Sequence, residues 1–308
     1  MSKRVAVMDL GTNTFHLLIA EGTVNNYHEI AHDQEPVKLG EGGINKGYIL
    51  PEAFARGIKT MQQFQQQISA NQVQQVRALA TSALRSASNG KDFIDEVKAK
   101  TGISIEIING EQEACFIYDG VKISGCLSAQ NSLIMDIGGG SVEFILGNAD
   151  HIIWKQSFEI GAARLMDLFH RTDPIPPASI EALDVYLQDN LTDLFAALEG
   201  HEVDTLIGSS GVFESFAAII ETEKGHSFDL KTTPTYSFDH EELLIETNKI
   251  VQSTHLQRAA NENIIPVRVD MIVVASLITR FIIHKLAIQK VSMCTNSLKE
   301  GVLAGMLD

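Results

Sequence analysis

Two short stretches of the chain each place an aspartate directly before a run of small residues. Residues 7–19 read VMDLGTNTFHLLI, and residues 134–146 read IMDIGGGSVEFIL. Apolar residues precede Asp9 and Asp136 and return after the small residues. Each stretch therefore predicts two strands joined by a tight turn, with the aspartate at the end of the first strand.

The small residues of these turns are suited to bind an anion such as phosphate. Glycine lets backbone N–H groups approach a ligand without a Cβ in the way, and the turn glycines are Gly11, Gly138, Gly139 and Gly140. An aspartate would repel the phosphate unless a cation lay between them, and Mg²⁺ is commonly held by one or two carboxylates plus phosphate oxygens. We therefore predict that Asp9 and Asp136 bind Mg²⁺ or another divalent cation. The simpler interpretation, an aspartate that only makes turn hydrogen bonds, is weakened by its recurrence in both copies.

A second pair of features follows the two hairpins. Residues 76–89 and 203–216 each predict a strand, a small-residue turn and the start of a helix, which is a ready anion site. In the second of these the candidate phosphate-binding residues are Ser209, Ser210 and Gly211. Asp9 and Thr81 are 72 positions apart, and Asp136 and Ser209 are 73 apart. This spacing indicates an internal duplication, although chance similarity of common small-residue turns is the alternative.

Length and composition restrict the class of protein. A chain of 308 residues with 44% hydrophobic and 20% charged residues is typical of a soluble globular protein with one large domain or two smaller ones. The most apolar run, residues 272–278, is too short to span a membrane, and Asp9 interrupts the apolar run that a secretion signal would need. We therefore expect a cytoplasmic protein without a membrane partner. Its net charge of −15 argues against a nucleic-acid partner.

The alternation of predicted strands and helices is typical of an α/β fold. We expect helices at residues 51–71, 91–100, 111–121, 161–169, 178–199, 242–253, 269–284 and 298–307, and further strands at residues 103–108, 152–158 and 291–294. A polar segment at residues 125–131 suggests a domain boundary. We expect one domain over residues 1–124, joined by the last helix at about 297–308, and a second over 125–296. The ligand is expected in the cleft between them.

Seven motifs together resemble the exopolyphosphatase and guanosine pentaphosphate phosphohydrolase family, within the sugar kinase, Hsp70 and actin superfold. In chain order they are DLGTNTFH from Asp9, ATSALRSASN from Ala80, INGEQEACFIYDGV from Ile108, DIGGGSVE from Asp136, GAARL from Gly161, GSSG from Gly208 and SLKEG from Ser297. They follow the family's order across nearly the whole chain. The resemblance implies a short form with two ribonuclease-H-like domains, which hydrolyses a terminal phosphoanhydride with the help of magnesium.

The same resemblance implies roles for particular residues. Glu113 matches the glutamate taken as the base that activates water, and Arg85 matches a basic position that would neutralise charge on the transferred phosphoryl group. Glu111, two positions before Glu113, lies about 200° around a helix and cannot share its direction. Asp136 and Glu143 match acidic positions that bind metal or orient the water.

Other matches concern the two turns. Gly138 and Ser141 match phosphate-binding positions, so the second turn is expected to be the catalytic one. The first turn, with Gly11, Thr12 and Asn13, is expected to help hold phosphate or metal. His16 stands where the second copy has Glu143, so the halves are not chemically equivalent. Lys299 stands where the family often has arginine, which keeps the charge and loses the bidentate fork.

The leading interpretation is an exopolyphosphatase that removes terminal phosphate from inorganic polyphosphate. Hydrolysis of the 5′-terminal phosphate of guanosine pentaphosphate (pppGpp), or of a short polyphosphate, is the nearest alternative. Two further alternatives are a non-catalytic sensor of nucleotide or polyphosphate and a kinase of the same superfold. The sequence leaves open whether the protein forms a homodimer. The basic residues expected to guide a polyanionic chain are Lys38, Arg85, Arg164, Arg258, Arg268 and Lys299.

Overall fold

The computed structural model describes residues 3–24, 26–209 and 211–307. The chain forms two compact units. The first comprises Met1–Gly120 with Leu298–Asp308, and the second comprises Val121–Ser297. Within the described residues, no helix combines the length and apolar character needed to cross a bilayer.

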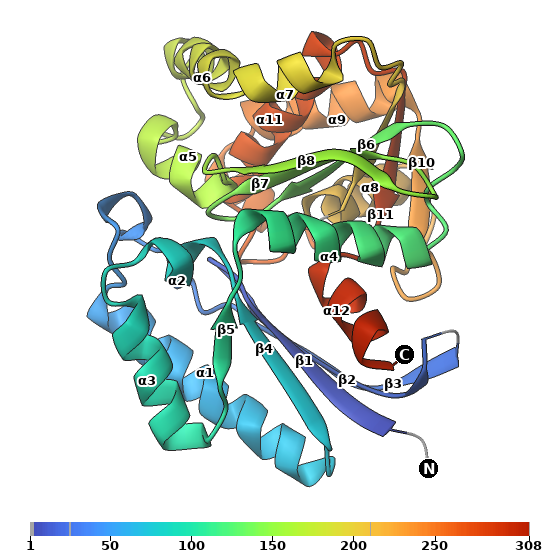
Figure 1. Cartoon of the computed structure of the whole chain (residues 1–308). Helices are drawn as coiled ribbons and strands as arrows, with labels where there is room; N and C mark the ends of the chain where they lie inside the picture. Colours follow the sequence, from blue (N-terminus) through green and yellow to red (C-terminus); the bar gives the residue numbers. More distant parts are fainter. Residues whose placement is uncertain (1–2, 25, 210, 308) are drawn as a thin grey trace. The chain divides into compact units, whose positions relative to one another are not determined.

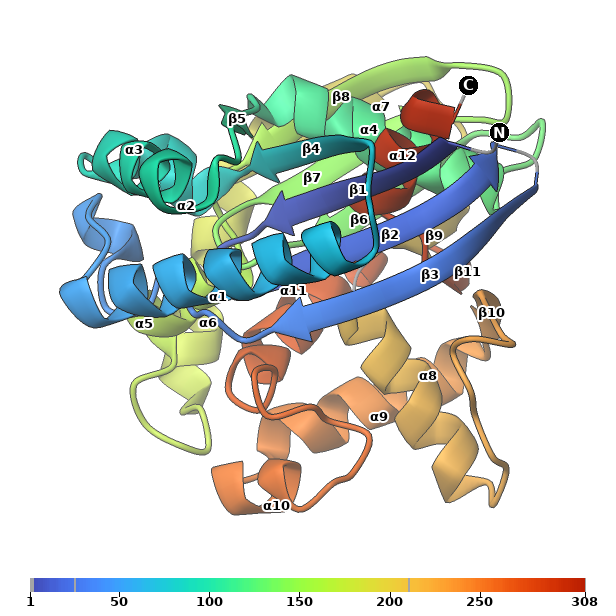
Figure 2. The same ribbon diagram turned by 90° about the horizontal axis from the view of Figure 1, so that it is seen from below.

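The first unit is built on a five-stranded sheet in the order β3-β2-β1-β4-β5 (Figure 2). Its strands are β1 (Lys3–Leu10), β2 (Phe15–Thr23), β3 (Asn26–Glu35), β4 (Gln75–Ala80) and β5 (Ile105–Ile107). The first three form an antiparallel meander, and β4 lies parallel to β1. Its helical segments are η1 (Ile44–Lys46), α1 (Pro51–Ala70), α2 (Ser82–Ser86), α3 (Gly90–Thr101), α4 (Gly110–Ile123, which continues into the second unit) and α12 (Leu298–Leu307).

Strand β1 is buried on both of its faces because helices cover both sides of the sheet. Ala6, Met8 and Leu10 belong to the apolar core that α1 and α3 close, while the alternate residues Val5 and Val7 are also fully buried. Helix α12 packs against β1 and β2. The last helix therefore completes the unit that begins with the first strand.

The second unit has a six-stranded sheet in the order β10-β11-β9-β6-β7-β8. Its strands are β6 (Ser132–Ile137), β7 (Val142–Gly147), β8 (Ile152–Phe158), β9 (Thr205–Gly208), β10 (Thr235–Phe238) and β11 (Lys290–Cys294). Its remaining helices are α5 (Ala162–Phe169), α6 (Pro177–Asn190), α7 (Thr192–Leu198), α8 (Gly211–Glu223), α9 (His240–Gln252), α10 (His255–Ala259) and α11 (Met271–Lys285). The apolar helix α11 packs against α5, α6 and α9 (Figure 1).

The two sheets share one plan. In each, an antiparallel meander (β1-β2-β3 or β6-β7-β8) is followed by a strand that returns parallel to the first one (β4 or β9). A helix follows directly, α2 in the first unit and α8 in the second. The predicted hairpins and strand–turn–helix features are thus confirmed, and both aspartates lie on the central strand of their own sheet.

Four elements, η1, β3, β10 and α10, were not predicted, and one predicted helix was wrong. Strand β3 is mostly polar, with only Ile30 and Ala31 packed against the core, so its sequence shows no clear alternation and its pairing with β2 defines it. The short elements β10 and α10 were missed as well. The single helix predicted at residues 178–199 is two helices, because the chain leaves helical geometry at Leu191, with φ −106° and ψ 19°.

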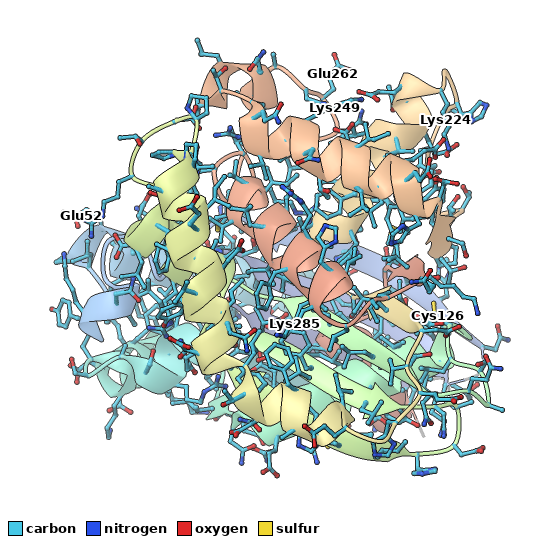
Figure 3. The ribbon with its side chains drawn as sticks, turned by 90° about the horizontal axis from the view of Figure 1, so that it is seen from above. Glu52, Cys126, Lys224, Lys249, Glu262 and Lys285 are labelled. Atoms are coloured by element: carbon cyan, nitrogen blue, oxygen red, sulfur yellow. The ribbon has the colours of Figure 1, made fainter. Side chains whose placement is uncertain are left out.

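A charged cluster stabilises the outer helices of the second unit. Glu221 of α8 accepts hydrogen bonds from Tyr236 at 2.7 Å, from the His226 ring at 2.8 Å and from Lys224 at 3.2 Å. Lys224, which is labelled in Figure 3, also forms an ion pair with Glu242 of α9 at 2.6 Å. These hydrogen bonds lower the pKa of Glu221 to about 2, and the bond from Tyr236 has the largest effect.

We expect Glu221→Gln to lower the melting temperature by a few degrees at neutral pH. Because the folded state lowers this pKa, the stabilisation is fully present above pH 4.5 and is lost as the pH falls toward 2. Thermal melts of both proteins at several pH values would measure the difference. Glu241→Gln, at a neighbouring exposed position, is the control. A difference that does not shrink on acidification would contradict the assignment.

Candidate active site

The strand register places a second side chain directly opposite each aspartate. Asp9 pairs with His16 across the β1–β2 hairpin, and Asp136 pairs with Glu143 across the β6–β7 hairpin. Side chains at directly opposite positions of an antiparallel pair lie on the same face. The second hairpin therefore presents two carboxylates together, whereas the first presents one carboxylate and an imidazole.

The start of helix α5 binds the glycine turn of the second unit through its carbonyl groups. Ala162 N–H donates to the carbonyl oxygen of Gly138 at 2.9 Å, Ala163 N–H to that of Gly139 at 2.9 Å, and Gly161 N–H to that of Gly140 at 3.2 Å. In a trans peptide the C=O and the following N–H point in opposite directions.

The N–H groups of residues 139, 140 and 141 consequently point away from α5. Successive N–H groups that point the same way form an anion-binding concavity. This geometry suits phosphate at Gly139, Gly140 and Ser141. The Ser141 side chain is buried, with the residue 2% exposed, so its backbone is the better candidate for contact.

Residue 161 must be glycine for this arrangement. A Cβ at Gly161 would lie 2.4 Å from both the Gly140 carbonyl carbon and the Ser141 nitrogen, which are backbone atoms with little freedom to move. Its φ of −63° suits any residue, so the requirement is steric.

We expect Gly161→Ala to push α5 away from the turn and to lower the free energy of unfolding by about 1–3 kcal/mol. Denaturant titration would measure the change. Gly305→Ala is the matched control, because a Cβ there meets no atom within 4 Å. Equal stability of the two variants would contradict the steric argument.

The turn of the first unit is bound in the same way by a different segment. Gly40 N–H donates to the Thr12 carbonyl oxygen at 2.9 Å, and Lys38 N–H donates to that of Asn13 at 2.7 Å. By the same peptide geometry, the N–H groups of Asn13 and Thr14 point away from this segment. A Cβ at Gly40 would lie 2.6 Å from Thr12 Cγ2, so a glycine again permits the close approach.

Two hydroxyl groups hold the carboxylate of Asp136. Ser297 Oγ donates to its Oδ2 at 2.5 Å, and Ser209 Oγ lies 3.5 Å from the same oxygen. Ser209 also donates to the Asn296 carbonyl oxygen at 3.0 Å, which is the stronger of its two contacts. Because Ser209 has no exposed surface, its hydroxyl connects strand ends, which differs from the phosphate contact we predicted.

Of the other two residues of that predicted turn, Ser210 lies outside the described residues, and Gly211 provides no open phosphate site. Gly211 begins helix α8 and is covered by Arg268, since a Cβ at residue 211 would lie 1.6 Å from Arg268 Nη2. The guanidinium of Arg268 pairs with Glu214 at 3.2 Å, and burial lowers its pKa.

Glu143 is held from the strand on its other side. The residue is 1% exposed, and its Oε1 accepts a hydrogen bond from Ser157 Oγ at 2.6 Å. Ser157 lies opposite Glu143 in the β7–β8 register. Sequence reasoning missed this partner, because the strand was predicted but its pairing was not.

Glu113 is a buried carboxylate in the first turn of α4. Its Oε2 forms an ion pair with Arg85 Nη1 at 2.9 Å, and the same nitrogen donates to the Ile108 carbonyl oxygen at 3.1 Å. The structure therefore pairs the proposed base with the proposed charge-neutralising arginine. Arg85 orients Glu113, and its side chain is 20% exposed.

A capping interaction fixes the beginning of α4. Asn109 Oδ1 accepts from the Gln112 backbone N–H at 2.8 Å, and Gln112 Oε1 accepts from the Asn109 N–H at 3.0 Å. This cap sets the helix phase, so Glu113 is buried while Glu111 is exposed. The prediction that these two glutamates point in different directions is confirmed.

Asp9 has a buried oxygen that suits a cation. Among the described residues, its Oδ1 has no hydrogen-bond partner. Burial raises the pKa of Asp9 to about 6, against the opposing effect of Lys299. An oxygen of this kind is costly to bury unless a positive group or a metal compensates it, so Asp9 fits the predicted divalent-cation ligand.

The side chains that the structure describes do not form a complete metal cage by themselves. The described residues contain no group of three or more His, Cys, Asp or Glu side chains able to hold a metal. This agrees with the chemistry of Mg²⁺, which often takes one or two carboxylates and completes its shell with water and phosphate oxygens. The residues available for that role are Asp9, Asp136 and Glu143.

The basic residues predicted to guide a substrate differ in their positions. Arg258 is 2% exposed and binds Asp173 at 2.6 Å, so it has a structural role and our prediction for it was wrong. Arg164 lies at the glycine turn, with Nε donating to the Gly140 carbonyl oxygen at 3.1 Å and Nη2 paired with Glu159. Lys299 is paired with Glu300 on α12 at 3.1 Å.

Known proteins resemble this chain in sequence and fold over nearly its whole length. A model of the Ppx/GppA phosphatase family matches residues 18–308. An exopolyphosphatase from Cytophaga hutchinsonii is 38% identical and superimposes with a TM-score of 0.95, covering 99% of this chain and 98% of its own. The Ppx-GppA enzyme of Aquifex aeolicus is 22% identical with a TM-score of 0.81, covering 99% of this chain and 100% of its own. The predicted α/β fold of two actin-like domains is confirmed.

Proposed function

Because the chain belongs to the Ppx/GppA phosphatase family, a family of phosphoanhydride hydrolases, we propose that it is an exopolyphosphatase that releases terminal phosphate from inorganic polyphosphate. The observation that carries this proposal is the second hairpin. It combines three aligned backbone N–H groups at residues 139–141 with the paired carboxylates Asp136 and Glu143. The similarity to the Cytophaga exopolyphosphatase supports the choice of polyphosphate.

The chemistry proposed for the individual residues follows from their contacts. The N–H groups of residues 139–141 bind phosphate oxygens, and those of Asn13 and Thr14 offer a second such contact. Glu113 accepts a proton from the attacking water, or orients it, for in-line attack on the terminal phosphorus. Arg85 is a positioning residue in this scheme, because its guanidinium holds the Glu113 carboxylate.

Magnesium completes the proposed site. When bound to Asp136, Glu143 or Asp9, the ion would offset the charge of the phosphate oxygens. Ser297 keeps the Asp136 carboxylate in a fixed orientation, and Ser157 does the same for Glu143. The two carboxylates are therefore positioned before any ligand binds, which lowers the cost of reorganisation.

The net charge of −15 opposes a polyanionic substrate at long range. Local positive groups must therefore act close to the phosphate chain. Arg164 does not meet this need at the N–H groups of the turn, because its guanidinium bonds the Gly140 carbonyl oxygen on the α5 side. We place the reaction in the cytoplasm, a reducing compartment in which the three cysteines would stay as thiols.

Phosphate release from long polyphosphate, short polyphosphate and pppGpp, measured side by side with magnesium, tests the proposal. We expect turnover of polyphosphate, abolished by a chelator and restored by added magnesium. Preferential release from pppGpp would favour the alternative within the same family. Binding of polyphosphate without metal-dependent release from any substrate would indicate a sensor and overturn the proposed activity.

A further inference from the structure

Two of the three cysteines lie next to each other in the second unit, although 168 positions separate them in the sequence. Cys294 ends β11, and Cys126 lies in the connection between α4 and β6 (Figure 3). The two side chains are close enough that each thiol shifts the pKa of the other. The hydroxyl of Ser124 links them further, because its Oγ accepts from the Cys126 N–H at 3.2 Å and from Cys294 Sγ at 3.2 Å.

The environments of the two thiols differ. Cys126 is half-buried, whereas Cys294 is 1% exposed. The contact with Cys294, supported by Ser124, lowers the pKa of Cys126 to about 7, while the same contact and burial raise the pKa of Cys294. Cys126 is thus the accessible thiol with thiolate character, and Cys294 is a protonated neighbour within reach.

We propose that Cys126 and Cys294 are a redox-sensitive pair that forms an intramolecular disulfide when the protein meets a peroxide. The Cys126 thiolate attacks one peroxide oxygen, the O–O bond breaks, and Cys126 becomes a sulfenic acid. The other oxygen leaves as hydroxide, which takes up the proton that the Cys126 thiol released and becomes water. The Cys294 sulfur then attacks the Cys126 sulfur, the S–O bond breaks, and the hydroxyl leaves with the Cys294 proton as water. Overall, the two thiols lose two electrons and the peroxide is reduced to two water molecules.

The pair is connected to the carboxylate that we place in the active site. The Cys294 thiol also contacts the Asn296 carbonyl oxygen at 3.4 Å, and that oxygen accepts the Ser209 hydrogen bond. The next residue, Ser297, binds Asp136. Oxidation removes the Cys294 S–H and joins the Cys294 sulfur to Cys126. Residues 294–297 must then change position, and Ser297 of this segment orients Asp136.

The disulfide would also constrain the chain where it enters and leaves the second unit. The unit begins at Val121 and ends at Ser297, so Cys126 follows its start closely and Cys294 precedes its end closely. We therefore infer that oxidation reduces the hydrolytic activity. This part of the inference rests on the proposed function, whereas formation of the disulfide does not.

Thiol counting and peptide mapping test the disulfide directly. After treatment of the full chain with hydrogen peroxide, we expect two of the three thiols to be lost and a cross-linked peptide pair containing Cys126 and Cys294. A thiol reductant should restore both. Cys126→Ser should form no such cross-link, and Cys294→Ala provides a second variant at the buried position. Cys115→Ser is the matched control, because Cys115 lies on α4, apart from the pair, and should not affect the cross-link.

Overoxidation of Cys126 with Cys294 still reduced, a cross-link to Cys115, or no loss of thiols would each overturn the disulfide.

The effect of the disulfide on activity is a separate test. We expect oxidation to lower phosphate release from polyphosphate about tenfold, reversibly, because the Asp136 carboxylate is displaced. Cys126→Ser should keep its activity under peroxide. An intact disulfide with unchanged activity would refute the coupling to Asp136. If the reduced protein released no phosphate from any substrate, the proposed function would be wrong. The thiol count would still show whether the disulfide forms, because it does not depend on activity.

Discussion

Glu113→Gln is expected to lower kcat for polyphosphate by about 10²–10⁴-fold, the usual contribution of a general base. Glutamine has nearly the same shape and keeps an oxygen that can accept from Arg85, which now bonds the carboxylate at 2.9 Å. The amide cannot take a proton from water. Substrate affinity should therefore change little, because the proposed phosphate contacts come from the backbone N–H groups of the turns.

Steady-state kinetics and a separate binding measurement would distinguish these effects. Glu111→Gln is the matched control, since it makes the same change on the same helix at an exposed position. The melting temperature of Glu113→Gln should also be recorded, because the variant gives up a buried ion pair. Near-normal turnover in a folded Glu113→Gln protein would rule out this residue as the base.

Asp136→Asn is expected to reduce kcat about 10²-fold or more, the size of effect typical for loss of a preorganised electrostatic group. The magnesium concentration for half-maximal activity should rise as well. The amide can still accept the Ser297 hydrogen bond that now holds Asp136 at 2.5 Å, so the local structure should persist. What disappears is the negative charge beside Glu143.

Asp9→Asn should have a smaller effect on activity. Asp9 lies opposite His16 and lacks the second carboxylate that accompanies Asp136. Magnesium titrations of both variants, compared with the parent protein, would measure the difference. Equal losses with equal changes in magnesium dependence would contradict a division of labour between the two turns.

The position of the candidate residues along the strands could be predicted from the sequence. A tight turn between two apolar runs fixes the register of a hairpin, so Asp136 had to lie near Glu143 once both strands were recognised. The cap at Asn109 and the helical repeat likewise separated Glu113 from Glu111. These relations are local, because they depend on residues a few positions apart.

Functions assigned to isolated residues were less reliable. Arg258 and Ser209 are of types that often bind phosphate, yet both are buried and bonded to other parts of the protein. Their partners, Asp173 and Asn296, are 85 and 87 positions away. No local pattern reveals such contacts, since they depend on how helices and strands pack after folding.

The sequence by itself determined the two aspartate-ended hairpins, because alternating apolar residues and small turn residues specify strands and turns locally. It could not determine what the turns face. Packing of α5 onto residues 138–140 directs three N–H groups to one side, and Ser157 and Ser297 reach the carboxylates from strands or connections distant in sequence. The anion and metal roles that we propose for the second hairpin therefore depend on tertiary structure, because only the folded chain brings those donors together.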